Sequence, residues 1–298
     1  MKISGNRSEV QAIEANFNIS SVENIEEGNV IKQVNLDEVL FLLVGVDTKD
    51  VSEIQVGKDE ATGIRSDTMM LCKVNFKDGS IKIMSLPRDS RLKVKGSLDK
   101  LNHAHSYGGM KLLMKTVRDF TNLDVDYYVR VDYGAVKALV NAIGGVDVEI
   151  TQKMKYHDTT KGMELHIDFE PGMQRLDGDD AIRFLRFRSY KRGDEDRVVA
   201  QQYFLTQMIK QVLEPKNILS LPKMFDAYLK YIDTNMDPKI IYQGISLAGK
   251  LDRENIETMT IPGYGATRKE DGISYYFVDA KGTKAMIEEH FSEYLMKK

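Results

Sequence analysis

The feature that most constrains the fold is the alternation of short apolar segments with longer amphipathic ones along residues 37–298. Residues 39–46 form an apolar run of eight residues, far below the roughly 20 residues that a membrane-spanning helix needs, so we expect a buried strand. Residues 68–76 and 80–86 have two further strand patterns, joined at a Lys77-Asp78-Gly79 sequence that is typical of a hairpin turn. Strands interleaved with helices predict a layered α/β fold.

Helical periodicity accounts for most of the remaining chain. Gly144-Gly145 ends one helical segment before a short alternating strand at residues 146–150. No repeat or low-complexity tract divides the chain after residue 36, so we expect one domain over residues 37–298. Helices are expected at residues 103–120, 132–143, 194–213, 220–232, 238–251 and 279–295.

Residues 1–36 differ in composition from the rest of the chain. They are rich in Asn, Ser and Glu with scattered Ile and Val, which is typical of a polar leader or a membrane-proximal stalk. The segment lacks the apolar core of a signal peptide. We therefore expect either a cytosolic protein or a chain that begins after a removed membrane anchor.

Charge and reactive residues exclude several classes of site. The formal net charge of -3 gives no overall attraction to a polyanion, so such a ligand must bind at a local cluster. The single cysteine, Cys72, excludes an internal disulfide and a multi-thiolate metal site. His103 and His105 have no third residue at the spacing of a zinc site, and we expect His103 to be structural. No phosphate-binding loop or nucleophile elbow occurs.

Arginine is concentrated in one short segment. Lysine is twice as common as arginine in the whole chain, yet residues 183–197 hold five arginines and one lysine. The guanidinium fork matches phosphate oxygens two at a time, so this segment favours a site that orients phosphates. An extended segment would place Arg186 and Arg188 on one face, and we expect both to be partly buried and to converge with Arg88. The alternative is an edge strand with a solvated basic face.

A second pattern joins polar and apolar residues along one helix. Asp194, Arg197 and Gln201 are three and four residues apart, so they share a face that continues as Leu205 and Met208. A face that passes from charged to apolar suits an amphiphile with an anionic head and a lipid tail. For Asp194 alone, the alternative is a plain helix N-cap.

Three strand boundaries also have acidic or basic residues. Asp47 follows the first strand, Arg65 and Asp67 precede the second, and Arg88 follows the third. Carboxylates placed there would hold Mg²⁺, and arginines would neutralise phosphate oxygens. Ordinary turn chemistry explains any one of these residues; their joint occurrence favours a site.

Eight short segments resemble the LytR-CpsA-Psr family, in the family's own order, over nearly all of residues 38–295. One such segment would be a weak match, but eight in order make a chance resemblance very improbable. They are FLLVGVD (41–47), RSDT (65–68), SLPRD (85–89), KLNHA with YGG (100–104 and 107–109), IGGVDV (143–148), GMQRLDGDDA (172–181), RFR (186–188) and GDEDRVVAQQ (193–202).

The resemblance implies a three-layer α-β-α sandwich with a central mixed sheet that encloses a hydrophobic tunnel for a polyprenyl tail. Family members transfer teichoic acid, capsule or another secondary wall polymer from a polyprenyl-pyrophosphate carrier to peptidoglycan through a phosphodiester, using Mg²⁺ or Mn²⁺. They act at the extracytoplasmic face of the bacterial membrane, held by a single N-terminal helix that this chain would lack. Few aromatic residues accompany the arginines, so no nucleic-acid partner is expected.

The resemblance also implies roles for individual residues. Asp47 and Asp67 would be the metal ligands, and Leu205 and Met208 would line the lipid tunnel. The pyrophosphate would be bound by Arg65, Arg88, Lys100, Arg186, Arg188, Arg197 and Gln201. The catalytic set would be Arg88, Asp67, Asp194, Arg186 and Arg188.

The expected reaction is attack by a peptidoglycan sugar hydroxyl on the phosphorus bonded to the glycan, with polyprenyl phosphate as the leaving group. Either Asp67 or Asp194 would accept the proton, and the sequence leaves this choice open. Two alternatives remain: hydrolysis of the lipid pyrophosphate by the same residues, and a non-catalytic regulatory module that binds polyanions.

Overall fold

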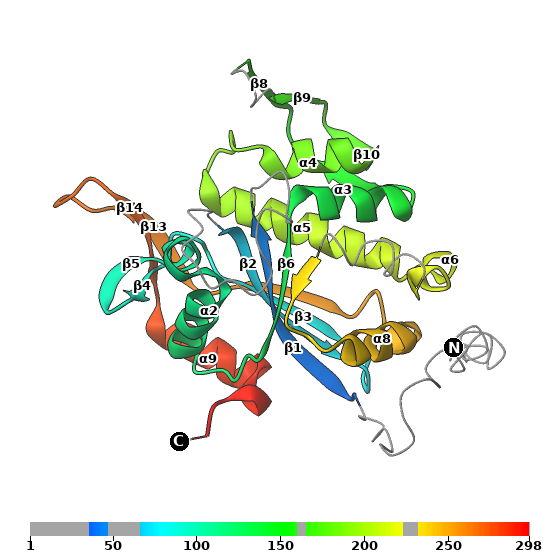
Figure 1. Ribbon diagram of the computed structural model, residues 1–298. Coiled ribbons are helices and arrows are strands. Elements are labelled where there is room, and N and C mark those ends of the chain that lie inside the picture. The colour runs from blue at the N-terminus through cyan, green and yellow to red at the C-terminus, as the bar shows by residue number, and fades with distance from the viewer. Residues whose placement is uncertain (1–35, 47–65, 160–164, 223–231, 298) are drawn as a thin grey trace.

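A mixed sheet forms the centre of the computed structural model, which describes residues 36–46, 66–159, 165–222 and 232–297. Its six strands lie in the order β11-β6-β1-β2-β3-β12 (Figure 1). β1 pairs antiparallel with β2 and parallel with β6, and β3 pairs parallel with β12. The strands are β1 (Glu38–Val46), β2 (Ser66–Asn75), β3 (Ile81–Ser85), β6 (Tyr127–Val131), β11 (Ile232–Thr234) and β12 (Ile256–Thr260).

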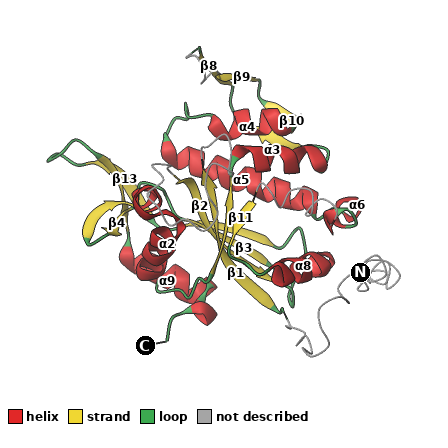
Figure 2. Ribbon diagram, in the orientation of Figure 1, coloured by secondary structure: helices red, strands yellow, loops and turns green. Residues whose placement is uncertain are grey.

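Helices cover both faces of this sheet, so the expected α/β fold with a central mixed sheet is confirmed. α2 and α9 lie on one face, and α3, α5 and α8 lie on the other (Figure 2). The helices are α2 (Leu101–Thr121), α3 (Tyr133–Ala142), α4 (Gly178–Arg186), α5 (Asp194–Val212), α6 (Pro215–Ile218), α8 (Pro238–Leu247) and α9 (Ala280–His290), with 3-10 turns η4 (Ala248–Lys250) and η5 (Ser292–Tyr294).

Four two-stranded ribbons surround this framework. The β13–β14 ribbon lies against β4, and Tyr276 forms a β-bridge with Ser90, the residue before β4. Of these eight strands, the sequence predicted only the one at residues 146–150. The ribbons are β4 (Arg91–Val94) with β5 (Ser97–Lys100), β7 (Val146–Ile150) with β10 (Gly172–Leu176), β8 (Met154–Asp158) with β9 (Leu165–Phe169), and β13 (Gly263–Thr267) with β14 (Ser274–Val278).

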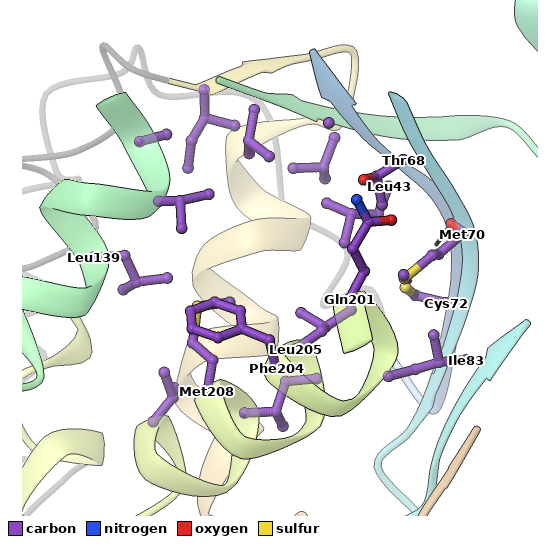
Figure 3. Close-up of a pocket in the computed structure, with 18 of the residues that line it drawn as sticks. Leu43, Thr68, Met70, Cys72, Ile83, Leu139, Gln201, Phe204, Leu205 and Met208 are labelled. Carbon is purple, nitrogen blue, oxygen red and sulfur yellow. Dashed lines mark hydrogen bonds between the residues drawn. The ribbon is translucent and has the colours of Figure 1, made fainter. Parts of the chain in front are cut away.

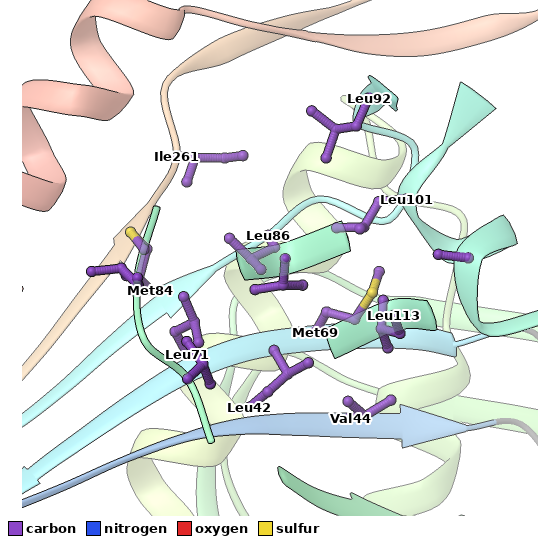
Figure 4. Packing of buried hydrophobic residues seen from close by; sticks show 14 of the residues in the cluster. Leu42, Val44, Met69, Leu71, Met84, Leu86, Leu92, Leu101, Leu113 and Ile261 are labelled. Carbon is purple, nitrogen blue, oxygen red and sulfur yellow. The ribbon is translucent and has the colours of Figure 1, made fainter. Parts of the chain in front are cut away.

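The main core lies between the sheet and the helices α2 and α9. Leu42 of β1 and Leu71 of β2 point to this face and pack with Leu113 of α2 (Figure 4). All three side chains are fully buried. Burying one such side chain contributes about 1.5–3 kcal/mol, so this layer fixes the sheet on which the site is built.

A buried charge explains why the sequence did not predict β6. The fourth of its five residues, Arg130, is enclosed on the α2 side of the sheet, where its Nη2 lies 2.7 Å from Asp233 Oδ2. Its Nη1 also lies 3.3 Å from His105 Nε2. An arginine within a short segment interrupts the apolar pattern by which a buried strand is predicted. Arg130 can be buried here because it contacts His105 of α2 and Asp233 of β11.

Other predicted elements agree with the structure to within a few residues, with three exceptions. The turn at residues 77–79 joins β2 to β3, and Gly79 has the positive φ of 74° that this turn requires. The helix expected at residues 220–232 is wrong at its end, because Ile232 begins strand β11; residues 223–231 lie outside the described residues. The helix expected at residues 238–251 ends at Leu247 and continues as η4. The helix expected at residues 279–295 ends at His290, and the chain continues as η5.

None of the helices in the described parts of the chain combines the length and the apolar character that a membrane crossing requires.

Candidate active site

A cavity of about 490 Å³ lies between the sheet and α5, on the face opposite the main core. Its lining is almost entirely apolar, and its volume is in the range of small-molecule sites. Well-packed interiors leave few spaces larger than a water molecule, so a cavity of this size and lining favours an apolar ligand. Figure 3 shows the wall residues Leu43, Met70, Cys72 and Ile83 from the sheet, Leu139 from α3, and Phe204, Leu205 and Met208 from α5.

The polar residues of this cavity gather at one end of it. Asp67 and Thr68 begin β2, Asp132 follows β6, and Gln201 lies on α5. The amide of Gln201 reaches toward Thr68 (Figure 3). Because β1 and β6 are parallel, this is the end at which both strands finish, and α/β folds commonly place their ligand groups there.

Five charged residues form an alternating chain at this mouth. Asp67 lies between two arginines: Oδ1 is in direct contact with Arg88 Nη1, and Oδ2 lies 3.4 Å from Arg188 Nη2. Asp194 also lies between two, with Oδ1 at 3.4 Å from Arg88 Nη2 and 2.6 Å from Arg197 Nη2. Arg88 therefore joins both carboxylates and is the centre of the network.

Lys100 joins the network through a third carboxylate. Its Nζ lies 3.0 Å from Asp89 Oδ1, and Asp89 Oδ2 lies 4.0 Å from Arg88 Nε. Four cations and three carboxylates leave one excess positive charge among these residues. An anion at the mouth would balance that charge.

Burial and neighbouring charges act in opposite directions on the two inner arginines. Burial by itself would lower the pKa of Arg88, but Asp194 and Asp67 outweigh it and raise the pKa above its ordinary value. For Arg197, burial outweighs the attraction of Asp194 and lowers the pKa. In the described part of the chain, the buried Nε of each arginine has no hydrogen-bond partner, so both can donate to an anion.

Helix α5 connects the charged mouth to the apolar cavity. Arg197 and Gln201 are buried in its first turns, and Gln201, Leu205 and Met208 line the cavity wall. The predicted common face is therefore confirmed. The alternative for Asp194 is wrong: Gly193 is the N-cap, and Asp194 is the first helical residue.

Gln202 fixes the position of this helix from its other side. Its Nε2 lies 2.8 Å from Ser85 Oγ, 2.6 Å from the carbonyl oxygen of Met259 and 3.1 Å from Thr260 Oγ1. These acceptors end the neighbouring strands β3 and β12. The contacts hold the start of α5 against the sheet, where Arg197 and Asp194 meet Arg88.

The expected extended segment around Arg186 and Arg188 is wrong. Arg186 is the last residue of α4, and Arg188 follows Phe187, the C-cap. The helix begins at Asp177, whose carboxylate accepts hydrogen bonds from the backbone N–H groups of residues 179 and 180. Ala181 and Phe184 are buried three residues apart, which is a helical period. The two-residue spacing of the arginines suggested an extended segment instead.

The two arginines consequently occupy different surroundings. Arg188 reaches Asp67, but its side chain is 58% exposed, so the expected burial is wrong for this residue. Arg186 is half-buried, and its Cζ lies 5.9 Å from the ring centre of Tyr133, which lines the cavity. Among the described residues Arg186 forms no ion pair. It borders the mouth without joining the network.

Comparison with known proteins identifies the family. The LytR_cpsA_psr family model matches residues 4–292. The chain belongs to the LytR_cpsA_psr family. A relative from Bacillus cereus, named polyisoprenyl-teichoic acid–peptidoglycan teichoic acid transferase TagU, is 32% identical over 250 residues, which are 78% of each chain.

Solved structures related to this LytR_cpsA_psr protein share its fold. The crystal structure of B. subtilis TagV is 25% identical, with a TM-score of 0.69 over 85% of this chain and 98% of that one. The structure described as TagT bound to LIIa-WTA is 26% identical, with a TM-score of 0.67 over 92% of this chain and 95% of that one.

The metal site expected in this family member would be formed by carboxylates at the mouth. Asp47 and Arg65 lie outside the described residues, so their roles stay predictions. Among the residues that are described, no group of three or more potential ligands is placed to hold a metal. Asp67 supplies one of the one or two carboxylates that Mg²⁺ often takes, but each of its oxygens already contacts an arginine, so its role as a metal ligand stays a prediction.

Several residues at the site were not expected from the sequence. Asp89 belongs to the SLPRD segment, but the resemblance implies a role only for its neighbour Arg88. Tyr133 is the first residue of α3, a helix that was predicted, but no role at the site was expected for it. Phe204 lies three residues after Gln201 on the same face of α5, so the spacing that found Leu205 also indicates it.

Proposed function

We propose that this protein transfers a phosphate-linked glycopolymer from a polyprenyl-pyrophosphate carrier to peptidoglycan. One observation carries the proposal: an apolar cavity meets an arginine network at Asp67 and Gln201, so that one site can hold a lipid tail and an anionic head. The printed name of the Bacillus cereus relative supports the same reaction class, with teichoic acid as the polymer. Capsule or another secondary wall polymer would use the same chemistry.

The lipid tail is assigned to the cavity, which would serve as the entrance of a tunnel between α5 and the sheet. Leu205 and Met208 supply its wall next to Gln201. Each buried CH₂ group contributes about 0.8 kcal/mol, so a long prenyl chain would supply most of the binding energy.

The pyrophosphate is assigned to the mouth. Arg88, Arg188 and Arg197 would direct guanidinium N–H groups to its oxygens, with Lys100 and the half-buried Arg186 at the edges. Charge-assisted hydrogen bonds of this kind are roughly twice as strong as neutral ones. A pyrophosphate would also balance the excess positive charge of the network.

The reaction follows from this placement. A sugar hydroxyl of peptidoglycan attacks the phosphorus that bears the glycan; a new O–P bond forms, and the bond from this phosphorus to the bridging oxygen breaks. Polyprenyl phosphate leaves, and the arginines stabilise the charge that develops. The hydroxyl proton passes to Asp67 or Asp194; Asp194 is the more accessible, with its side chain 32% exposed against 13%.

Mg²⁺, or Mn²⁺ in its place, would be held by Asp67 with Asp47 and would neutralise charge on the phosphate oxygens. With these substrates, the protein would act at the extracytoplasmic face of the bacterial membrane, held by a single-pass N-terminal anchor.

Product analysis tests the proposed function. The protein is incubated with Mg²⁺, a polyprenyl-pyrophosphate-linked glycan and uncross-linked peptidoglycan strands. We expect polymer joined to the strands through a phosphodiester, together with polyprenyl phosphate. Free glycan phosphate as the main product would instead establish a hydrolase, and retained binding without turnover would establish a regulatory module.

Two variants sharpen this experiment. Asp67→Ala should lose Mg²⁺-dependent turnover and keep its melting temperature, because the residue begins a strand at the mouth and is outside the main core. Arg183→Ala is the matched control: Arg183 pairs with Asp180 on the outer side of α4, and turnover should not change. Wild-type activity in Asp67→Ala would remove this residue from the mechanism.

A further inference from the structure

The β13–β14 ribbon is attached to the residues that form the charged mouth. The backbone N–H of Tyr276 donates a hydrogen bond of 2.9 Å to the carbonyl oxygen of Asp89, next to Arg88. On the other strand, a Cβ added to Gly265 would lie 3.7 Å from Glu195 Oε1, in the first turn of α5. The middle of the ribbon therefore lies beside the mouth, and its tip extends outward (Figure 1).

One face of this ribbon holds a row of aromatic rings. Tyr264 is paired with Phe277, and Ala266 with Tyr275, so the three rings point to the same side. Tyr264 and Phe277 are stacked, with ring centres 5.6 Å apart and planes at 23°. Phe277 and Tyr275 meet edge to face at 6.4 Å.

The end of the row nearer the tip of the ribbon contacts the network, and the end nearer its base is exposed. Lys100 Nζ lies 5.7 Å from the ring centre of Tyr275, and Arg91 Cζ lies 5.6 Å from it. At the other end, Tyr264 is 63% exposed although it stacks on Phe277. A large exposed aromatic residue beside a charged site is a candidate contact surface.

Size and shape indicate which partner this surface fits. A stable protein interface buries about 800 Å² on each partner, far more than two stacked rings offer. A sugar ring has two flat faces of C–H groups and a rim of hydroxyls. Its face packs on an aromatic ring through apolar contact, while its rim remains free to accept hydrogen bonds from cations such as Lys100 and Arg91.

The position of Arg88 separates this surface from the lipid cavity. Its neighbour Asp67 lines the cavity, and its neighbour Asp89 holds the ribbon. A transfer between two substrates needs the donor phosphorus at Arg88 and the acceptor hydroxyl on a side of this phosphorus that the donor leaves free. With the lipid tail in the cavity on the Asp67 side, the acceptor would approach from the Asp89 side, where the ribbon lies.

We propose that the aromatic face of the β13–β14 ribbon binds the acceptor glycan strand of peptidoglycan, with one sugar ring stacked on Tyr264. This inference rests on the proposed function and specifies where its second substrate binds. Tyr264 is a binding residue in this scheme and has no part in the chemical step.

The absence of tryptophan from the chain allows a direct binding test. Tyr264→Trp introduces the only tryptophan, a ring that can still stack and can be excited selectively over the tyrosines, and soluble uncross-linked peptidoglycan strands are the probe. We expect a saturable shift of its emission to shorter wavelength, because the ring loses its solvent contact when a sugar covers it.

Steady-state kinetics then show whether the surface serves the reaction. Tyr264→Ala should raise the KM for the strands about tenfold, the cost of about one stacked aromatic contact. Its kcat and its affinity for the polyprenyl-pyrophosphate donor should not change, and Tyr264→Phe should restore the KM. Ile273→Ala is the control, because Ile273 is 41% exposed near the same ribbon but lies before the ribbon's paired strand β14.

The outcomes separate this inference from the proposed function. An unchanged KM for the strands in Tyr264→Ala, with transfer intact, would overturn the inference and leave the function standing. An emission shift caused by the strands in a protein that transfers nothing would support the surface and refute the function. An emission shift caused by the free anionic polymer and not by the strands would overturn the choice of partner.

Discussion

The two faces of the central sheet use alternate residues of the same strands, yet they are covered in different ways. On β1, Leu42 and Val44 enter a close-packed core with α2 (Figure 4). The residue between them, Leu43, lines a cavity under α5 (Figure 3). Both faces are apolar, so hydropathy alone does not distinguish them. Whether the covering helix fills the space decides which face stabilises the fold and which can bind a ligand.

Charged residues differ between the faces in the same way. On the packed face, Arg130 is enclosed with a single carboxylate, Asp233, and with His105. At the mouth on the cavity face, Arg88 shares its carboxylates with further cations, and positive charge remains in excess. On the packed face, the paired charges of Arg130 and Asp233 hold β6 and β11 together. On the cavity face, the excess positive charge can bind an anion.

The largest effect should come from breaking the balanced pair. Asp233→Ala leaves Arg130 buried without its carboxylate, which should lower the free energy of unfolding by about 3–5 kcal/mol. Urea unfolding followed by circular dichroism measures this. The control is Asp119→Ala, which removes an exposed partner of Lys115 and should change the stability by less than about 1 kcal/mol. Equal losses in the two variants would contradict the structural role given to Arg130 and Asp233.

Removing the central arginine of the mouth should affect turnover and leave the fold intact. Arg88→Ala deletes the guanidinium shared by Asp67 and Asp194, and kcat should fall by about 10² to 10³. Arg88→Lys should recover little of it, because an ammonium lacks the fork that bonds two phosphate oxygens. Steady-state turnover of the lipid-linked donor measures both variants. Activity within a few-fold of wild type in Arg88→Ala would remove Arg88 from the centre of the site.

Truncation of one leucine on each face compares the packing directly. Leu42→Ala opens a void in a filled core and should cost about 2–5 kcal/mol of unfolding free energy. Leu205→Ala enlarges an existing cavity and loses fewer contacts, so we expect a cost of about 1 kcal/mol. Chemical denaturation of both variants gives the two values. If Leu205→Ala proved as costly as Leu42→Ala, the α5 face would be packed like the other.

The smallest effect is expected at Cys72, the single thiol of the chain, which lines the cavity. Burial raises the pKa of this thiol to about 12, so it stays protonated at neutral pH and alkylates slowly. A polyprenyl lipid present at about ten times its Kd should slow alkylation about tenfold further. Mass spectrometry follows the labelling. An unchanged rate would mean that the lipid does not reach this wall.

Some of this site could be predicted from local sequence. The turn at residues 77–79 makes β2 and β3 antiparallel neighbours, so Asp67, at the start of one, lies beside Arg88, at the end of the other. The spacing of Gln201, Leu205 and Met208 indicated the cavity face of α5. Both predictions depend on regular periods within single elements.

The parts that failed depend on contacts between distant elements. The spacing of Arg186 and Arg188 suggested a strand, but packing of Phe184 against Phe204 of α5 holds α4 in a helix. The meeting of Asp194 with Arg88 requires α5 to be fixed on the sheet, which Gln202 does through acceptors on two strands. The sequence alone places none of these partners.

The most direct test of a site that holds head and tail together is the affinity for polyprenyl pyrophosphates of different length. Shortening the chain by several prenyl units should weaken binding by much more than tenfold, since each buried CH₂ contributes about 0.8 kcal/mol. Pyrophosphate alone should bind weakly. In Leu205→Asp, with folding checked by melting, the dependence on chain length should largely disappear. Equal affinities of the wild-type protein for the short and the long lipid would contradict the lipid-carrier role of the cavity.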